Sequence, residues 1–184
     1  MMLCGQRTYA VNFEDSHLRD PRYFAWLRDL EVVKHIGRDE LLRGITFPEV
    51  ESYVAGLRRV GGCTFLAVYA AEERAFIGTA KINFLAESGI REGVADIGIM
   101  IGDRSFWGRG MATDILRSVS KYAFDELGAR KLVAGAMSPN IAVIRAFENV
   151  GYVREGLLRS QFNVAGSHCD HVLLGCFNAE LKRA

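Results

Sequence analysis

Residues 94–102, VADIGIMIG, carry an apolar side chain or glycine at nearly every position. A strand with one solvated face would alternate apolar and polar residues, so this run predicts a strand buried on both faces or lying beside a ligand. The segment DRSFWGRGMATD, residues 103–114, follows it and leads into a helical pattern that ends at Gly128. A buried strand, a glycine turn and a helix in this order predict an α/β fold.

The other periodicities extend this unit to one mixed α/β domain over residues 1–184, with no internal repeat or linker. Before the buried strand we expect a strand at 8–13, one helix over 21–37, a helix at 48–60, and strands at 64–70 and 75–84. After the glycine turn we expect a helix at 112–127, a strand at 132–137, a helix at 141–150, and two strands between 152 and 177 around a turn at 165–167.

Charge and cysteine usage narrow the class of protein. The formal net charge is +1, which gives no electrostatic reason to expect a nucleic-acid partner. Charged residues interrupt every apolar run well before membrane-spanning length, so we expect no membrane segment. The four cysteines form no CxxC pair and the first residues lack a signal-peptide core, so we expect reduced thiols and a cytoplasmic protein.

The glycine turn allows two interpretations, an ordinary tight turn or an anion site. The first N–H groups of a helix have no intrahelical partner, and Gly108 and Gly110 carry no Cβ to keep an anion away from them. Arg109 adds a positive charge. The P-loop pattern is absent, and Thr113 stands where a dinucleotide fingerprint needs its third glycine.

A third pattern does match. Residues 107–112, WGRGMA, resemble the acetyl-CoA loop Gln/Arg-x-x-Gly-x-Gly/Ala of the GNAT superfamily of N-acetyltransferases. Trp107 departs from the first position, and an aromatic residue there is typical of the RimJ/RimL-like branch. Residues 140–152, NIAVIRAFENVGY, resemble a second segment of that branch, and residues 22–36 resemble its substrate-side helix.

This resemblance implies acetyl-CoA as co-substrate and two central strands, 94–102 and 132–137, that splay apart to hold its pantetheine arm. Main-chain amides near Ile99, Met100 and Ile101 would bond to the arm, and the glycine loop would hold the pyrophosphate. The predicted cofactor-binding residues are Ile99, Met100, Ile101, Gly108, Arg109, Gly110, Met111, Ala112, Thr113, Asn140 and Phe147.

For the catalytic base the resemblance favours Asp96, or a water that it holds; a paired structural carboxylate is the alternative. His35 could instead line the acceptor pocket and titrate near neutrality, but a plain histidine at a helix end is the favoured interpretation. Many relatives have a hydroxyl residue at the positions of Phe147 and Val143, neither of which can donate a proton. Release of the thiolate would then depend on solvent, on amide dipoles, or on Tyr122 or Ser138.

Residues 168–171, His-Cys-Asp-His, have the side chains of metal ligands. In a strand they point alternately to opposite faces, so they cannot converge on one ion, and we expect no metal. Asp170 is expected to anchor the closing hairpin.

The function expected from the resemblance is acetyl transfer to a primary amine. The acceptor is either a small molecule, such as an amino-sugar nucleotide or a polyamine, or a protein N-terminus. Arg38 and Arg43 can meet a nucleotide phosphate or be plain surface arginines. A non-catalytic acyl-CoA-binding domain is the rival from another class, and the chain is expected to be a monomer or a homodimer.

Overall fold

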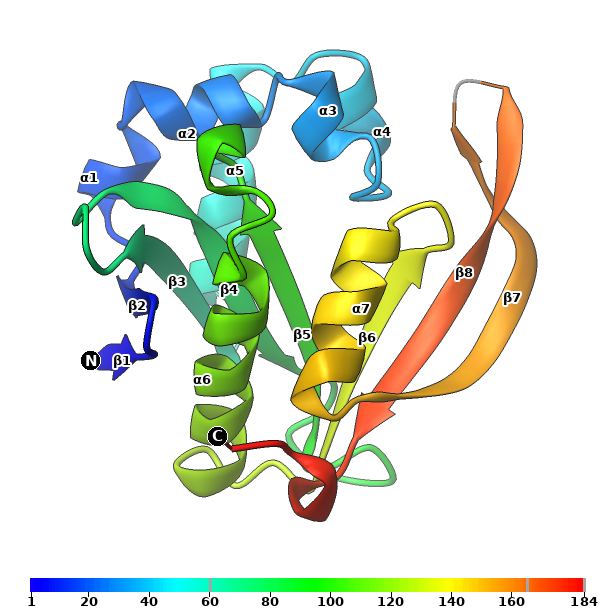
Figure 1. Ribbon diagram of the computed structural model, residues 1–184. Helices are drawn as coiled ribbons and strands as arrows, with labels where there is room; N and C mark the ends of the chain where they lie inside the picture. The colour runs from blue at the N-terminus through cyan, green and yellow to red at the C-terminus, as the bar shows by residue number, and fades with distance from the viewer. Residues whose placement is uncertain (60, 165, 184) are drawn as a thin grey trace.

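The computed structural model describes residues 1–59, 61–164 and 166–183 (Figure 1). Within these residues the strands form one sheet in the order β1-β2-β3-β4-β5-β6-β8-β7. The strands are Met2–Cys4 (β1), Thr8–Asn12 (β2), Cys63–Ala70 (β3), Phe76–Phe84 (β4), Val94–Ile101 (β5), Lys131–Met137 (β6), Val153–Val164 (β7) and Ser167–Cys176 (β8). Neighbours pair antiparallel except β5 and β6, which are parallel.

Helices cover both faces of this sheet (Figure 1). The α-helices are Asp15–Leu18 (α1), Pro21–Trp26 (α2), Leu30–Val33 (α3), Asp39–Leu42 (α4), Phe47–Arg59 (α5), Met111–Asp125 (α6) and Ile141–Val150 (α7). One apolar core lies beneath α6 and α7, and a second lies between the sheet and the segment from α1 to α5. The predicted mixed α/β fold is confirmed. In the part of the chain described, no helix has the length and apolar character to cross a membrane.

The predicted single helix over 21–37 is wrong. The chain turns at Leu27–Asp29, and a new helix, α3, starts there because the Asp29 side chain accepts a hydrogen bond from the Glu31 N–H at 2.9 Å. The short elements β1, α1 and α4 were not predicted, since three or four residues carry no readable period. Val60, at the predicted end of one helix, and Ala165, in the predicted last turn, lie outside the described residues.

The parallel pair β5 and β6 separates soon after it begins. Their register covers only Val94–Asp96 against Lys131–Val133. Beyond Asp96, β5 stays paired with β4 as far as Ile101, and β6 stays paired with β8 as far as Met137. The sheet therefore divides into two halves with a widening gap between them, as the predicted splaying of these strands requires.

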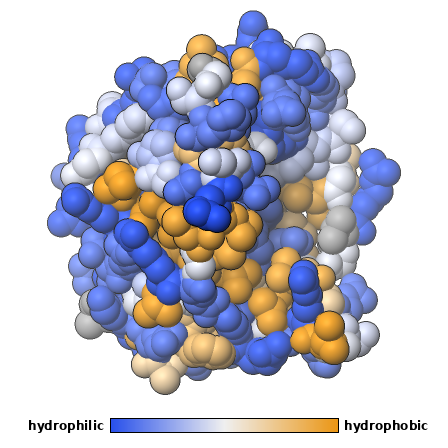
Figure 2. Space-filling view, turned by 90° about the vertical axis from the view of Figure 1, so that its right-hand side faces the viewer, coloured by the Kyte–Doolittle hydropathy of each residue, from blue (hydrophilic) through white to orange (hydrophobic). Residues whose placement is uncertain are grey.

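The edge strand β7 has a neighbour on one side only, β8. Its side chains at Val153, Leu157 and Leu158 are exposed. Figure 2 looks at the molecule from the side on which β7 and β8 lie, and it shows apolar surface surrounded by hydrophilic residues.

A buried carboxylate fixes the start of α6 to the N-terminal strands. Asp114, which is 6% exposed, accepts hydrogen bonds from the N–H groups of Gln6, Arg7 and Thr8 at 2.9–3.1 Å. The Thr8 hydroxyl donates a fourth at 2.7 Å. The first turn of α6 is thus held to the turn between β1 and β2.

Replacing Asp114 by Ala should lower the free energy of unfolding by about 2–4 kcal/mol, because two buried donors of Thr8 and two partly buried amides lose their acceptor. Chemical denaturation measures the change. Asp125→Ala is the matched control, since Asp125 lies on the same helix but is paired with Arg183 at the surface, and it should change stability little. Equal losses in the two variants would contradict this role of Asp114.

Candidate active site

A cavity of about 840 Å³ occupies the gap between β5 and β6. Its lining on the side of α6 and α7 includes Met111, Ala112, Thr113, Asn140, Val143 and Phe147. On the opposite face of the sheet it is lined by Tyr23, Leu27, His35, Arg38, Tyr53 and Lys81, among others. The cavity therefore reaches from one face of the sheet to the other through the open gap.

The backbone of β5 presents free hydrogen-bonding groups to this gap. At the two ends of the β4–β5 ladder, Leu85 N–H donates to Val94 O at 2.9 Å and Gly102 N–H donates to Ile77 O at 2.8 Å. Bonded pairs alternate in an antiparallel ladder, so Gly98 and Met100 direct their backbone groups to β4. Residues 97, 99 and 101 direct theirs to the gap.

This alternation corrects one predicted contact. Ile99 and Ile101 face the gap as expected, but the amide of Met100 belongs to the β4 ladder, and Ile97 takes its place beside the gap. Met100 still lines the cavity. Alternation along the strand is regular, but which set of amides faces the gap depends on the register of β5 against β4, which the sequence alone does not give.

Trp107 holds the glycine loop against the end of β5. Its indole Nε1 donates a hydrogen bond to Ile101 O at 2.8 Å. One of the carbonyl groups that face the gap is therefore already bonded. The departure of Trp107 from the usual motif marked this residue, but its contact was not predicted.

The glycine loop is open where a ligand would approach. Gly108 and Gly110 have φ of +73° and +78°, and a Cβ added at either would meet nothing within 4 Å. Gly110 is the N-cap of α6 and supplies no side-chain cap, so the first-turn N–H groups of residues 111–113 have no cap from that position. Gly108, Gly110 and Met111–Thr113 all line the cavity. This arrangement suits a diphosphate.

Arg109 points away from the main cavity. Its guanidinium lies 3.6 Å from Glu73 and packs over the Phe106 ring, while its carbonyl accepts a hydrogen bond from Arg7 at 3.1 Å. Together with Arg7 and Arg117 it lines a neighbouring cavity of about 420 Å³. The positive charge of Arg109 therefore acts on the glycine loop from the side of this neighbouring cavity, not from the main cavity.

Asn140 and Phe147 form part of the wall on the α7 side. The Asn140 side chain accepts a hydrogen bond from the Val143 N–H at 3.4 Å and caps α7, as predicted. Phe147 is 2% exposed and lies edge-on to Tyr152. Tyr122 and Ser138, the two alternative proton donors, are not among the residues that line this cavity.

Asp96 is the last β5 residue paired with β6, at the closed end of the gap. Its carboxylate lies 3.9 Å from the Lys81 ammonium, and burial raises the pKa of Asp96, while the charges of Lys81 and His171 lower it. Asp96 lies just outside the residues that line the cavity, whereas Lys81 is one of them. Asp96 is thus next to a residue of the cavity lining without being part of that lining itself.

His171 on β8 is a functional candidate that the sequence singled out only as one of several histidines. A Cβ at Gly135 would come within 2.0 Å of His171 Nε2, so the missing side chain lets the imidazole lie over β6. Burial lowers the pKa of His171, and the charge of Asp96 raises it. The ring therefore lies over β6, although His171 is not among the residues that line the cavity.

Residues 34–38, which connect α3 to α4, cover the cavity on this face of the sheet, and we call this segment the roof. A Cβ at Gly37 would lie 3.3 Å from the Phe162 ring and 3.4 Å from Met137, so this segment meets the other half of the sheet. His35 lines the cavity from the roof, and burial lowers its pKa.

The hairpin of β7 and β8 is held in shape where it meets this roof. Asp170 accepts a hydrogen bond from the Ser160 N–H at 2.8 Å, and Ser160 has a left-handed backbone, with φ of 50°. The register of the two strands shifts at this point, two residues before Phe162. Asp170 thus anchors the hairpin, as predicted.

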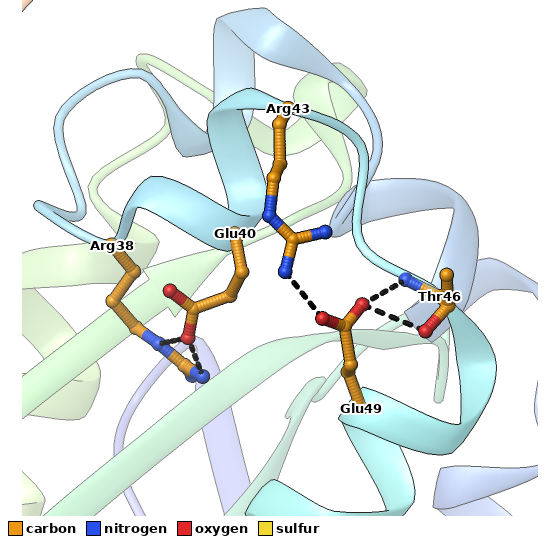
Figure 3. Close-up of polar contacts among 5 residues, drawn as sticks. All are labelled: Arg38, Glu40, Arg43, Thr46 and Glu49. Atoms are coloured by element: carbon orange, nitrogen blue, oxygen red, sulfur yellow. Dashed lines mark hydrogen bonds and ion pairs between the residues drawn. The ribbon is translucent and has the colours of Figure 1, made fainter.

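Two of the arginines near the roof differ in where they point (Figure 3). Arg38 lines the cavity, pairs with Glu40 and lies 4.0 Å above the Tyr53 ring. Arg43 pairs with Glu49, which also accepts hydrogen bonds from Thr46. Arg43 is not part of the cavity lining.

The predicted alternation of residues 168–171 along a strand is present in β8. Across residues 1–59, 61–164 and 166–183, no three His, Cys, Asp or Glu side chains form a group suited to a metal ion.

Residues 11–153 match the family model of the acetyltransferase (GNAT) domain. The chain belongs to this family. Among curated proteins it is similar to "Probable N-acetyltransferase YjcK" of Bacillus subtilis, with 29% identity over 113 residues, which is 61% of each chain. The chain thus matches less than two thirds of the length of this relative.

Solved GNAT structures share the fold. RimJ of Mycobacterium smegmatis, in complex with CoA-disulfide, has a TM-score of 0.81 at 19% identity over 100% of this chain and 90% of its own. Spermidine N-acetyltransferase of Vibrio cholerae, in complex with CoA and spermine, has a TM-score of 0.79 at 18% identity over 95% of this chain and 97% of its own.

If the glycine loop holds the diphosphate of coenzyme A, Gly110→Ala should weaken coenzyme A binding by about tenfold or more, because the methyl group would stand between the ligand and the amides at the start of α6. Calorimetry gives the affinity. Gly128→Ala is the control: Gly128 also has a positive φ, +71°, with open space around it, and it follows the other end of the same helix. Both variants should lose about 1 kcal/mol of stability from backbone strain. If both lost affinity equally, the loop would not be the binding site.

Proposed function

We propose that the protein is an acetyl-CoA-dependent N-acetyltransferase that acts on the primary amine of a small molecule, with residues 1–184 as a single domain. The observation that carries this proposal is the cavity through the gap between β5 and β6, which has the open glycine loop on one side of the sheet and a roofed pocket on the other. One ligand can enter from each side, and the two can meet in the gap.

The residues on the side of α6 and α7 fit coenzyme A. The amides at the start of α6 and the two open glycines would hold the diphosphate. The free backbone groups of Ile97 and Ile99 would bond to the amides of the pantetheine arm, as a strand edge bonds to an added strand. When bound, the coenzyme supplies an activated acetyl thioester.

The acceptor must lose a proton before it attacks. An alkyl amine with a pKa near 10.4 is neutral in only about one molecule in 2,500 at pH near 7, so a proton acceptor helps. Burial raises the pKa of Asp96, which makes this carboxylate a better base than a solvated one. We assign it this role through a water, with His171 as a positioning neighbour.

The leaving thiolate has no side-chain proton donor in this proposal. Phe147 and Val143 line the cavity where a hydroxyl would be needed, and neither can donate. Solvent and backbone dipoles would stabilise the thiolate instead. A transferase releases free coenzyme A thiol when an amine is added. The rival function, coenzyme binding without catalysis, predicts that no thiol is released.

The roof favours a small acceptor over a protein N-terminus. Residues 34–38 reach from α3 to the opposite half of the sheet, where Gly37 meets Phe162 and Met137. A polypeptide would need an open channel at this point, whereas a small amine can be enclosed.

Incubation of the protein with acetyl-CoA and a panel of amines, followed by free thiol, tests the proposal. We expect amine-dependent thiol release with small amines at a kcat/KM at least about tenfold higher than with peptides that have a free N-terminus. Preference for the peptides would support the protein-N-terminal function. Coenzyme binding without thiol release for any amine would support the non-catalytic rival.

Asp96→Asn should lower kcat/KM by on the order of 10²–10⁴. In the parent protein the rate should fall as the pH drops through the raised pKa of Asp96, because the carboxylate becomes protonated; in the variant this acidic limb should disappear. A pH profile of turnover measures both effects. Asp103→Asn is the control, since Asp103 caps the turn before the glycine loop through Ser105. An unchanged acidic limb in Asp96→Asn would remove Asp96 from this role.

A further inference from the structure

We propose that the acceptor carries a negatively charged group, a carboxylate or a phosphate, in addition to its amine, and that Arg38 binds this group. This inference rests on the proposed function and names the class of substrate that the roofed side of the cavity takes.

The charged side chains that line the cavity are mostly cationic. They are Glu31, Lys34, Arg38 and Lys81, with His35 as a further titratable group. Glu31 and Lys34 pair with each other at 2.8 Å and are well exposed at the rim. The two less exposed charges, Arg38 and Lys81, are both positive, at 29% and 28% side-chain exposure.

Each of these two cations pairs with a carboxylate that lies outside the cavity lining. Glu40 pairs with Arg38 (Figure 3). Asp96 lies 3.9 Å from Lys81. A ligand in the cavity therefore meets the cations first. Because Coulomb energy falls with distance, the potential at the ligand is positive even though each pair is neutral as a whole.

Arg38 is built to hold a planar or tetrahedral anion. Its guanidinium lies 4.0 Å from the centre of the Tyr53 ring, a cation–π contact that restrains the group. Glu40 occupies Nε and one N–H of Nη2, and the N–H groups of Nη1 bond to no protein atom within the described residues. These donors can reach a carboxylate or phosphate in the geometry that arginine prefers.

Lys81 extends the positive region to the floor of the cavity. It projects from β4 beside Gly98, where a Cβ would lie 3.7 Å from the lysine Cε. Its only acidic neighbour among the described ion pairs is Asp96, at a distance too long for a hydrogen bond. A second ammonium on the acceptor would be repelled by both Lys81 and Arg38, so a polyamine is disfavoured.

Binding of four primary amines of similar length to the coenzyme-A-saturated protein tests the proposal by calorimetry. They are 4-aminobutyrate and 3-aminopropyl phosphate, which are anionic at the far end, 4-aminobutanamide, which is neutral there, and 1,4-diaminobutane, which is cationic. We expect at least one anionic amine to bind about 10–100-fold more tightly than the amide, and the diamine to bind most weakly. Whichever of the two anionic amines binds more tightly shows whether the charged group of the acceptor is a carboxylate or a phosphate.

Arg38→Gln should remove most of this preference while the affinity for the neutral amide stays within about twofold. Arg38→Lys should restore part of it, because the charge returns without the planar fork. Arg43→Gln is the matched control, since Arg43 is the neighbouring arginine outside the cavity lining, and it should leave the preference unchanged.

Equal affinity for the four amines, a preference for the diamine, or no binding of either anionic amine would overturn the proposal, as would an anion preference that survives in Arg38→Gln. The assay does not depend on catalysis. If the anionic amines bind selectively but release no thiol from acetyl-CoA, the proposed transferase function fails while the charge selectivity stands.

Discussion

The separation of β5 from β6 after three paired residues is the constraint on which the rest of the site depends. Each strand keeps its outer neighbour, so the sheet remains intact while the backbone groups of Ile97 and Ile99 lose a strand partner. Unpaired backbone groups inside a fold are costly unless a ligand or water bonds to them. An extended molecule bound in the gap would therefore stabilise the fold by forming hydrogen bonds with these backbone groups.

Different structural features complete the cavity on the two faces of the sheet, a glycine loop on one and the roof on the other. On the face of α6 and α7, the buried Asp114 and the indole of Trp107 fix a loop whose glycines leave the helix start open. On the other face, residues 34–38 extend over the gap, and Gly37 approaches Phe162 so closely that an added Cβ would lie 3.3 Å from its ring. In the proposed function the first feature serves the coenzyme and the second selects the acceptor, and only the gap joins them.

The sequence was informative where the structure is local and regular. The long strands, α6, α7 and the N-cap at Asn140 follow from periodicity and capping chemistry, and the family follows from Trp107–Ala112. The break at Leu27–Asp29 has a local cause, the N-cap at Asp29, which the helical spacing of apolar residues over 21–37 concealed. The roof and the position of His171 over Gly135 depend on contacts between distant segments, which no local pattern encodes. The error at Met100 has a different cause: which amides face the gap depends on the register of the β4–β5 ladder.

The central claim is that a bound coenzyme completes the open edge of β5. Residue-resolved amide hydrogen exchange, followed by NMR with and without coenzyme A, tests it most directly. Exchange should slow at the N–H groups of Ile97 and Ile99, which face the gap, and stay unchanged at Gly98 and Met100, which bond to β4. Saturating coenzyme A that leaves Ile97 and Ile99 as fast as before, or that protects both sets equally, would contradict the account.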